Sequence, residues 1–480
     1  MSNTDRRQFL KLMGMAGITS TLKTNIAKAL AIPANNQTGS INDVEHIVIL
    51  MQENRPFDHH FGTLRGVRGF NDPRAVNIHL PLQGGGNTPA SVFLQPAGGS
   101  SFGVPPGTVG GPANGVDVIP PFRVNPASVS PGLTSLGLTY LPGTGHNWGP
   151  IHAAWNQGQY DNWAAGQGPI AMNYMTREDI PYHCALADAF TVGDAYYCSV
   201  LGPTNPNRYH LFAGCIGNVN YLGSGGTDGH GAGPVTYNGL SINGAYFVFE
   251  TFPEVLQAAG VSWKFYQDLA GRPFAPDFGD PGLNSFVGNF GDCTVRYSEQ
   301  YFTAPTSSPL FQNAVTGTQI SNTIPSASAP PSAWLAWQEQ LFSEFRSDVA
   351  NGTLPQVSYI VGPAGYTEHS NWPVNYGAWY ISQILDILVS NPEVFSKTVL
   401  IVNYDEGDGS FDHIVPPTPP QTPANGASTV SIENEIVAAN GEPTGFQSGP
   451  IGLARGCHSL RSRPGAKEAT SIPRSSITRR

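Results

Sequence analysis

Runs of mainly apolar and often β-branched residues predict the strands of this chain. One run covers residues 46–51, another covers residues 398–404, and shorter runs occupy residues 261–266 and 357–361. Each run is nearly continuous, without the alternation of a strand that has one face in water. Such runs are typical of strands covered on both faces, as in a parallel sheet.

A helical pattern precedes the last of these runs. Between residues 375 and 390, apolar side chains recur at the spacing of one helix face, and Asn391-Pro392 ends the segment. Strand, helix and strand in this order form a βαβ unit, whose strands run parallel. We therefore expect an α/β fold with a mainly parallel central sheet and helices on both faces. At 480 residues the chain can form one large domain with insertions, or two domains.

Acidic pairs follow the two longest runs. Glu53-Asn54 comes after the first run and Asp405-Glu406 after the second. Ligands gather beyond the carboxyl ends of parallel strands, so both pairs are expected in one cleft. Buried neighbouring carboxylates repel each other unless a cation or a proton neutralises one, which predicts a metal site. The alternatives are an ordinary turn cap at the first pair and an acidic turn at the second.

Thr204, which lies between two prolines, is the candidate nucleophile. It precedes residues 208–213, which are compatible with a helix. A threonine hydroxyl is too weakly acidic to attack unaided, but a divalent cation at a helix N-terminus would make its alkoxide accessible. The alternative is that Thr204 only caps this helix.

Two histidines, His146 and His369, complete the candidate chemistry. Each follows turn-forming residues, and an imidazolium can hold a phosphoryl oxygen or protonate a leaving oxygen. Each is alternatively a structural hydrogen-bonding residue. His413 is expected to support the metal ligands from behind.

Composition narrows the class of protein. Only 12% of residues are charged, and 56 Gly and 42 Pro predict long loops, the longest at 81–145. The net charge of −10 argues against a nucleic-acid partner. Residues 451–480 hold seven Lys or Arg and one acid, which leaves 17 basic and 33 acidic residues in the rest of the chain. Five cysteines show no metal-binding spacing, although a disulfide among the first three is possible in an exported protein.

The N-terminus has the features of an export signal. Arg6-Arg7 and Phe9-Leu10-Lys11 precede a weakly apolar stretch and a small-x-small site that ends at Ala31. Residues 1–31 therefore resemble a twin-arginine signal peptide, which predicts a periplasmic or secreted protein that is exported already folded. The alternative is a basic amphipathic N-terminal helix.

Longer motifs carry a family resemblance. Residues 51–67 closely resemble the opening motif of the bacterial phosphocholine-specific phospholipase C family, which includes a branch of acid phosphatases. The segments 203–208, 377–380 and 404–413 are similar to its further signatures, in the right order. The resemblance implies a phosphoesterase catalytic domain over residues 42–452 with an alkaline phosphatase-like fold. Asn205 and His60 stand where the family often has Asp and Tyr, which bears on specificity.

The resemblance also implies roles for the candidate residues. One divalent metal ion would be held by Glu53, Asn54, Asp405, Glu406 and Thr204, and Thr204 would become phosphorylated. His146 and His369 would bind the phosphoryl oxygens and act as acid and base. Arg208 and Trp148 are further candidates for substrate contacts, and the aromatic candidates for binding choline are Trp148, Trp155, Tyr160 and Trp163.

The function that the resemblance predicts is a phospholipase C. It would hydrolyse phosphatidylcholine, and sphingomyelin as a further substrate, at a membrane surface to release phosphocholine. The alternatives are a broad-specificity acid phosphatase and a truncated, inactive exported protein. Residues 453–480 form an atypical basic tail, for which our hypothesis is a shifted reading frame and the rival a native anion-binding tail.

Overall fold

The computed structural model describes residues 24–81, 85–97, 110–113, 116–129, 131–216, 236, 238, 249–270, 282–315, 317–326, 328–432, 435–437, 448–452 and 459–462. The predicted export signal lies largely outside these residues, except that residues 24–31 are helical. Within the described part of the chain, no helix combines the length and the apolar character that crossing a bilayer requires.

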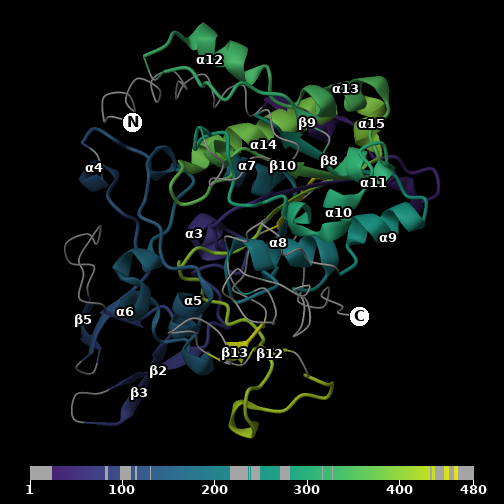
Figure 1. The fold of residues 1–480 in the computed structure, drawn as a ribbon. Coiled ribbons are helices and arrows are strands. Elements are labelled where there is room, and N and C mark those ends of the chain that lie inside the picture. Colours follow the sequence, from purple (N-terminus) through teal and green to yellow (C-terminus); the bar gives the residue numbers. More distant parts are fainter. Residues whose placement is uncertain are drawn as a thin grey trace.

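The centre of the molecule is a seven-stranded sheet. Neighbouring strands from β11 to β9 are parallel, and β14 is antiparallel to both of its neighbours. The prediction of a mainly parallel sheet is therefore confirmed. The spatial order is β7 (Thr191–Gly193), β14 (Ser459–Ser462), β11 (Thr398–Tyr404), β1 (His46–Gln52), β10 (Val357–Val361), β8 (Trp263–Asp268) and β9 (Gly317–Thr318) (Figure 1).

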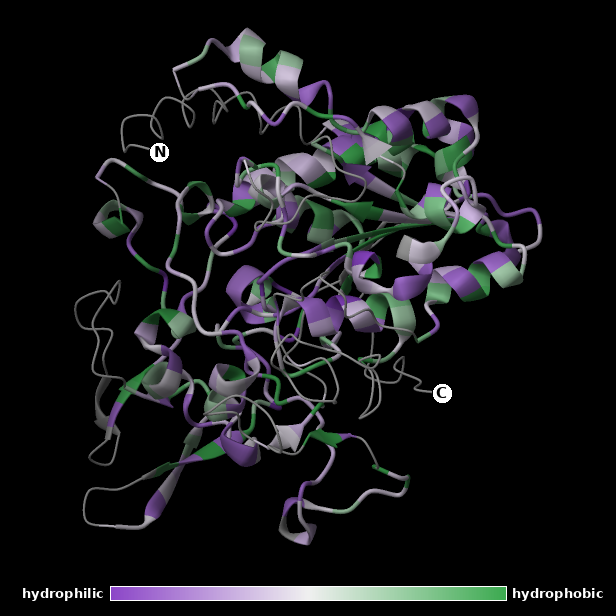
Figure 2. Ribbon diagram, in the orientation of Figure 1, coloured by the Kyte–Doolittle hydropathy of each residue, from purple (hydrophilic) through white to green (hydrophobic). Residues whose placement is uncertain are grey.

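Helices cover both faces of this sheet. Leu50 of β1 belongs to the same apolar cluster as Ile381 of α14 (Val374–Val389), whereas its neighbour Ile49 packs with Phe212 of α8 (Thr204–Ala213). Successive strand residues point to opposite faces, so these contacts place α14 and α8 on opposite sides. Figure 1 shows this layering, and Figure 2 shows apolar strands between helices of mixed character. Helix α14 also confirms the helix expected at 375–390.

Other helices of the described residues surround this core. They are α3 (Phe57–Phe61), α4 (Pro126–Val129), α5 (Trp148–Trp155), α6 (Trp163–Gln167), α7 (Pro181–Ala189), α9 (Phe252–Ala258), α10 (Glu299–Thr303), α11 (Pro309–Ala314), α12 (Pro331–Gln338), α13 (Ser343–Asn351) and α15 (Pro392–Ser396).

The loop-rich segment 81–145 carries short regular elements that its sequence did not predict. They form two small antiparallel sheets. The sequence did not predict them because strands of two to five residues are too short to show a hydrophobic period. One sheet pairs β2 (Asn77–Pro81) with β3 (Asn87–Ser91), and the other contains β4 (Gln95–Pro96), β6 (Val116–Ile119) and β5 (Gly110–Ala113). A third pair joins β12 (Ile436–Val437) to β13 (Gly449–Pro450).

The basic tail also contributes to the fold. Its residues 459–462 form β14, which pairs with β11 on one side and β7 on the other. The sequence pattern of the tail did not predict this strand. Cys184 and Cys215 are free, so the disulfide that was possible among the first three cysteines does not form, although Cys198 is disulfide-bonded.

Candidate active site

The two acidic pairs lie side by side at the carboxyl ends of β1 and β11. The strands stay in register to their last residues, and the N–H of Asp405 donates to the carbonyl oxygen of Gln52 at 3.0 Å. Neighbouring parallel strands therefore bring both pairs into one cluster, as their positions in the sequence predict. Four side chains in this cluster are each at most 1% exposed: Glu53, Asn54, Asp405 and Glu406.

Backbone hydrogen bonds join the two loops. The Oδ1 atom of Asp405 accepts from the N–H of Asn54 at 3.3 Å and from the N–H of Glu406 at 2.7 Å. Asn54 has a φ of 58°, in the left-handed region that asparagine tolerates better than most residues. One carboxylate thus holds the backbone on both sides of the cluster.

Thr204 is the first residue of α8 and not its cap. Pro203 occupies the cap position and makes no side-chain capping bond. The helix begins four residues earlier than the run 208–213 indicated. Pro206 is compatible with this start, because backbone N–H groups in a first helical turn have no partner within the helix. The structure therefore contradicts the alternative that Thr204 is only the cap of this helix.

Arg208 lies one turn after Thr204 on α8, on the same helix face. Its guanidinium contacts Glu53 Oε1 at 3.5 Å, Asp405 Oδ2 at 3.2 Å and Asp292 Oδ1 at 3.3 Å. The face of α8 that begins at Thr204 is thereby directed at the carboxylates.

The carboxylates outnumber the cation that faces them. Burial raises the pKa of Glu53 well above its ordinary value, Asp292 and Asp405 raise it further, and Arg208 opposes them. Burial raises the pKa of Asp405 to about 6, against the opposing effect of Arg208. A second positive charge, such as a metal ion, would stabilise the ionised form of these carboxylates.

The uncharged oxygens of the cluster fit a metal ion as well. The Oγ1 atom of Thr204 and the Oδ1 atom of Asn54 are buried and have no hydrogen-bond partner among the described residues. Carboxylate, amide and hydroxyl oxygens are the ligands of hard divalent cations. Adjacent carboxylates extend the ligand set, since ligand atoms of Glu406 and Asp408 lie within 4.8 Å of each other. The residues present therefore fit a metal ion.

His146 is held by Asp408. Its Nδ1–H faces two acceptors, Asp408 Oδ1 at 3.0 Å and the Thr144 carbonyl oxygen at 3.1 Å. Asp408 also accepts from the Asn54 amide at 3.3 Å, which links the histidine to the metal cluster. Burial opposes protonation of His146, but the charges of Glu406 and Asp408 outweigh it and raise its pKa to about 10.

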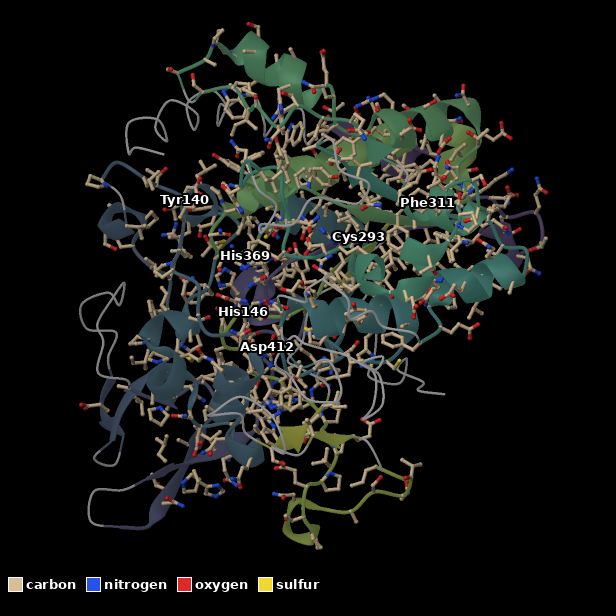
Figure 3. The ribbon with its side chains drawn as sticks, in the orientation of Figure 1. Tyr140, His146, Cys293, Phe311, His369 and Asp412 are labelled. Carbon is tan, nitrogen blue, oxygen red and sulfur yellow. The ribbon has the colours of Figure 1, made fainter. Side chains whose placement is uncertain are left out.

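His369 lies beside His146, with 5.8 Å between the two ring centroids (Figure 3). Its ring stacks on Phe290 at 3.8 Å, and its Nδ1–H donates to Oδ1 of Asn371 at 2.6 Å. Burial lowers the pKa of His369 to about 4 despite the charge of Asp408. One imidazole of the pair is thus cationic and the other neutral, as an acid and a base must be.

The residues expected to contact substrate lie deeper than the two histidines. Arg208 is 1% exposed and is engaged by carboxylates, and Trp148 stacks on His152 at 4.1 Å inside an apolar cluster. The other aromatic candidates for binding choline are also core residues: Trp155, Tyr160 and Trp163. These positions agree with the packing roles that are the ordinary alternative for such side chains.

Two residues of the site escaped the sequence analysis. Asp408 lies three residues after Asp405, and its place in the site follows from its bonds to His146 and Asn54, which its position in the sequence did not predict. Asp292 reaches the cluster from a loop between β8 and β9, and no strand run precedes it in the sequence. A lone Asp in a Gly/Asn-rich loop carries no signal of this kind.

His413 does not contact the metal cluster. Its Nδ1–H donates to Asp58 of α3 at 2.7 Å, and its Nε2 is 3.6 Å from Asp72. It also lines a cavity of about 740 Å³, whose other lining residues are 66–68, 71–76, Asp194, Ile414 and Val415. The bond between Asp58 and His413 ties α3 to the loop after β11, so the support that His413 gives to the site is indirect.

This ion pair predicts a pH-dependent stability. Burial opposes protonation of His413, but the bond to Asp58 outweighs it and raises the pKa from 6.5 to about 9. The stability that the pair contributes is therefore fully present below pH 6.5 and is lost as the pH rises through 9. We expect denaturant melts of the parent to lose on the order of 3 kcal/mol of unfolding free energy over this interval. His413→Gln should remove most of that slope, and parallel profiles for both proteins would contradict the assignment.

Fold and site together have the components of a metal-assisted hydrolase with a hydroxyl nucleophile. Comparison with known proteins agrees: the model of the Phosphoesterase family matches residues 44–455. The chain belongs to this family, which confirms the resemblance seen in its motifs. The α/β architecture likewise agrees with the expected alkaline phosphatase-like fold.

Several relatives are named phospholipases. The chain is 46% identical over 457 residues to a non-hemolytic phospholipase C of Burkholderia pseudomallei, covering 94% of this chain and 56% of that protein. It is 36% identical to a hemolytic phospholipase C of Pseudomonas aeruginosa (92% and 53% covered) and 35% identical to phospholipase C B of Mycobacterium tuberculosis (86% and 67% covered). The chain thus spans about half the length of its Burkholderia and Pseudomonas relatives.

Proposed function

We propose that this protein is a phospholipase C that hydrolyses phosphatidylcholine, and sphingomyelin as a further substrate, into phosphocholine and the lipid alcohol. The names of its relatives support the reaction class. The observation that carries the proposal is the buried hydroxyl of Thr204 at the start of α8, one turn before Arg208, whose guanidinium contacts the carboxylates that follow β1 and β11.

The proposed reaction has two displacements at phosphorus. The divalent cation, when bound, stabilises negative charge on the reacting oxygens and makes the Thr204 hydroxyl more acidic. Thr204 Oγ1 forms a bond to phosphorus while its proton passes to Nε2 of His369, and the bond to the diacylglycerol oxygen breaks. His146, which is cationic, protonates that oxygen. Water then attacks phosphorus, gives its proton to His146 and releases phosphocholine, and His369 returns its proton to Thr204.

The experiment that tests this function compares two chromogenic substrates in one preparation of metal-loaded protein. We expect p-nitrophenylphosphorylcholine to be turned over at least about tenfold faster than p-nitrophenyl phosphate, as measured by kcat/KM. The opposite order would indicate the alternative, a broad-specificity acid phosphatase. Turnover of neither substrate by a protein that binds metal and melts cooperatively would indicate an inactive protein.

We also propose that the protein reaches the periplasm or the exterior by the twin-arginine route and acts on phospholipid at a membrane surface. The support is Arg6-Arg7 and the small-x-small site ending at Ala31. Cell fractionation should find the parent outside the cytoplasm and the Arg6→Lys, Arg7→Lys double variant inside it. Equal export of both would contradict the route.

A further inference from the structure

Glu368, the residue before His369, is a fully buried carboxylate outside the metal cluster. It is 0% exposed, and its side chain is anchored by donors from three different elements. Its Oε1 atom accepts from Nε2 of His183 on α7 at 2.9 Å and from the Gln52 amide of β1 at 3.4 Å. Its Oε2 atom accepts from the hydroxyl of Tyr404, the last residue of β11, at 3.0 Å.

The backbone at Glu368 is unusual and is held in place. Its φ is 73°, a left-handed conformation that costs free energy for a residue with a long side chain. The carbonyl oxygen of Glu368 accepts from Nε of Arg55 at 2.8 Å, so the residue is fixed at both its backbone and its carboxylate. Strained conformations of this kind persist where their surroundings determine them and cluster at functional sites.

Helix α14 makes room for this side chain. A Cβ at Gly377 would collide with Cγ of Glu368 and lie 2.5 Å from its Oε1. Glycine in a helix interior is less favourable than alanine by roughly 1 kcal/mol. A glycine is therefore needed at position 377, because the Glu368 side chain packs directly against the backbone of α14 there.

The residue that follows this anchor is the neutral histidine of the site. At this turn the Glu368 side chain lies in the core, whereas the side chain of the next residue, His369, stacks on Phe290 and lies beside His146. We propose that Glu368 is the positioning residue of His369: its anchored carboxylate maintains the left-handed turn that holds the imidazole in the catalytic pair. This inference rests on the proposed function for the role of His369.

A neutral isostere cannot make the same contacts. The three groups that hydrogen-bond to the carboxylate all donate to it, and Nε2 of His60 lies 3.8 Å from Oε2. A glutamine would replace one acceptor oxygen by a donating NH₂ group. Glu368→Gln therefore conserves volume but removes one acceptor, which is that of the Tyr404 hydroxyl if the NH₂ group replaces Oε2, or that of His183 and Gln52 if it replaces Oε1. Buried donors that lose their acceptor are relieved by a shift of the segment, and His369 shifts with it.

A double-mutant cycle on metal-loaded protein tests the inference. We expect Glu368→Gln to lower kcat about 10- to 100-fold with KM unchanged within about twofold, and to cost nothing further in a His369→Ala background. A purely structural role would instead cost the same factor in both backgrounds, and that result would overturn the proposal. Parental kcat in Glu368→Gln would overturn it as well.

Gly377→Ala provides a second route to the same residue, from α14 and without removing any acid. We expect it to lower kcat in the same way and to be non-additive with Glu368→Gln; it carries the test if Glu368→Gln does not fold. Ser382→Ala, also on α14, is the matched control. Ser382 Oγ donates to the Trp379 carbonyl oxygen and accepts from the Gln383 amide, and both partners lie on the same helix. Parental kcat in Gly377→Ala, with φ of Glu368 unchanged, would contradict the proposal.

A crystal structure of Glu368→Gln separates this inference from the proposed function. We expect the His369 ring to leave its stack on Phe290, which is 3.8 Å in the parent. If His369→Ala retains parental kcat, the proposed catalytic role of His369 fails, whereas the positioning relation is still decided by the crystal structure. An unmoved His369 ring in that structure would overturn the positioning relation alone.

Discussion

Replacing Thr204 by alanine should abolish hydrolysis of choline phosphodiesters. Thr204 supplies the protein atom that attacks phosphorus in the first step of the proposed reaction, so we expect kcat to fall roughly 10⁴-fold or more. The side chain is 0% exposed and its hydroxyl has no hydrogen-bond partner among the described residues, so alanine removes the nucleophile with little effect on folding. Steady-state kinetics with p-nitrophenylphosphorylcholine measure the loss.

The matched control is Thr204→Ser, which keeps a hydroxyl at the same position. We expect it to retain measurable turnover, at a rate well above that of the alanine variant. Thr204→Ala with parental kcat would show that the covalent route is wrong. Equal inactivity of the serine and alanine variants, in proteins with normal metal content, would show that position 204 serves packing and not chemistry.

Replacing Asp405 by asparagine should have the second-largest effect, through the loss of metal. Asp405 is buried between the two strand ends, and burial raises its pKa to about 6, with Arg208 opposing this shift and Asp292 adding to it. We expect Asp405→Asn to lower bound metal to a small fraction of the parental content and kcat about 10³-fold. Elemental analysis of the purified protein, paired with kinetics, measures both.

Thermal melting gives the same experiment an independent readout. In the parent, metal binds the folded state and should raise the melting temperature, and a chelator should lower it. In Asp405→Asn the chelator should have little effect, because this variant holds little metal. Asp386→Asn, at a half-exposed acid on α14, is the control and should behave as the parent. An Asp405→Asn variant that retains full metal content would contradict the ligand assignment.

The central fold was predictable because its signals are long. The runs at 46–51, 357–361 and 398–404 became β1, β10 and β11 with bounds within one residue, and the helix at 375–390 became α14. Strands of two to four residues, such as β9 and β14, are placed by their partners in the sheet and not by their own sequence.

The site was predictable only where it follows from the sheet. Glu53 and Asp405 come together because parallel strands end at one edge, and Thr204 because a helix begins there. Asp292 and Glu368 were missed for a different reason. Asp292 reaches the cluster from a loop that has no hydrophobic periodicity. The position of Glu368 depends on a left-handed turn and on Gly377 of α14. Both depend on tertiary contacts that no local pattern encodes.

The most direct test of the covalent mechanism is to trap the enzyme during turnover. Metal-loaded protein is mixed with p-nitrophenylphosphorylcholine, quenched in acid within a few turnovers, digested and examined by mass spectrometry. We predict a phosphocholine adduct on the peptide that contains Thr204, assigned to that residue by fragmentation, and none in Thr204→Ala. Rapid turnover with an unmodified Thr204, or with the adduct on another side chain, would contradict the account.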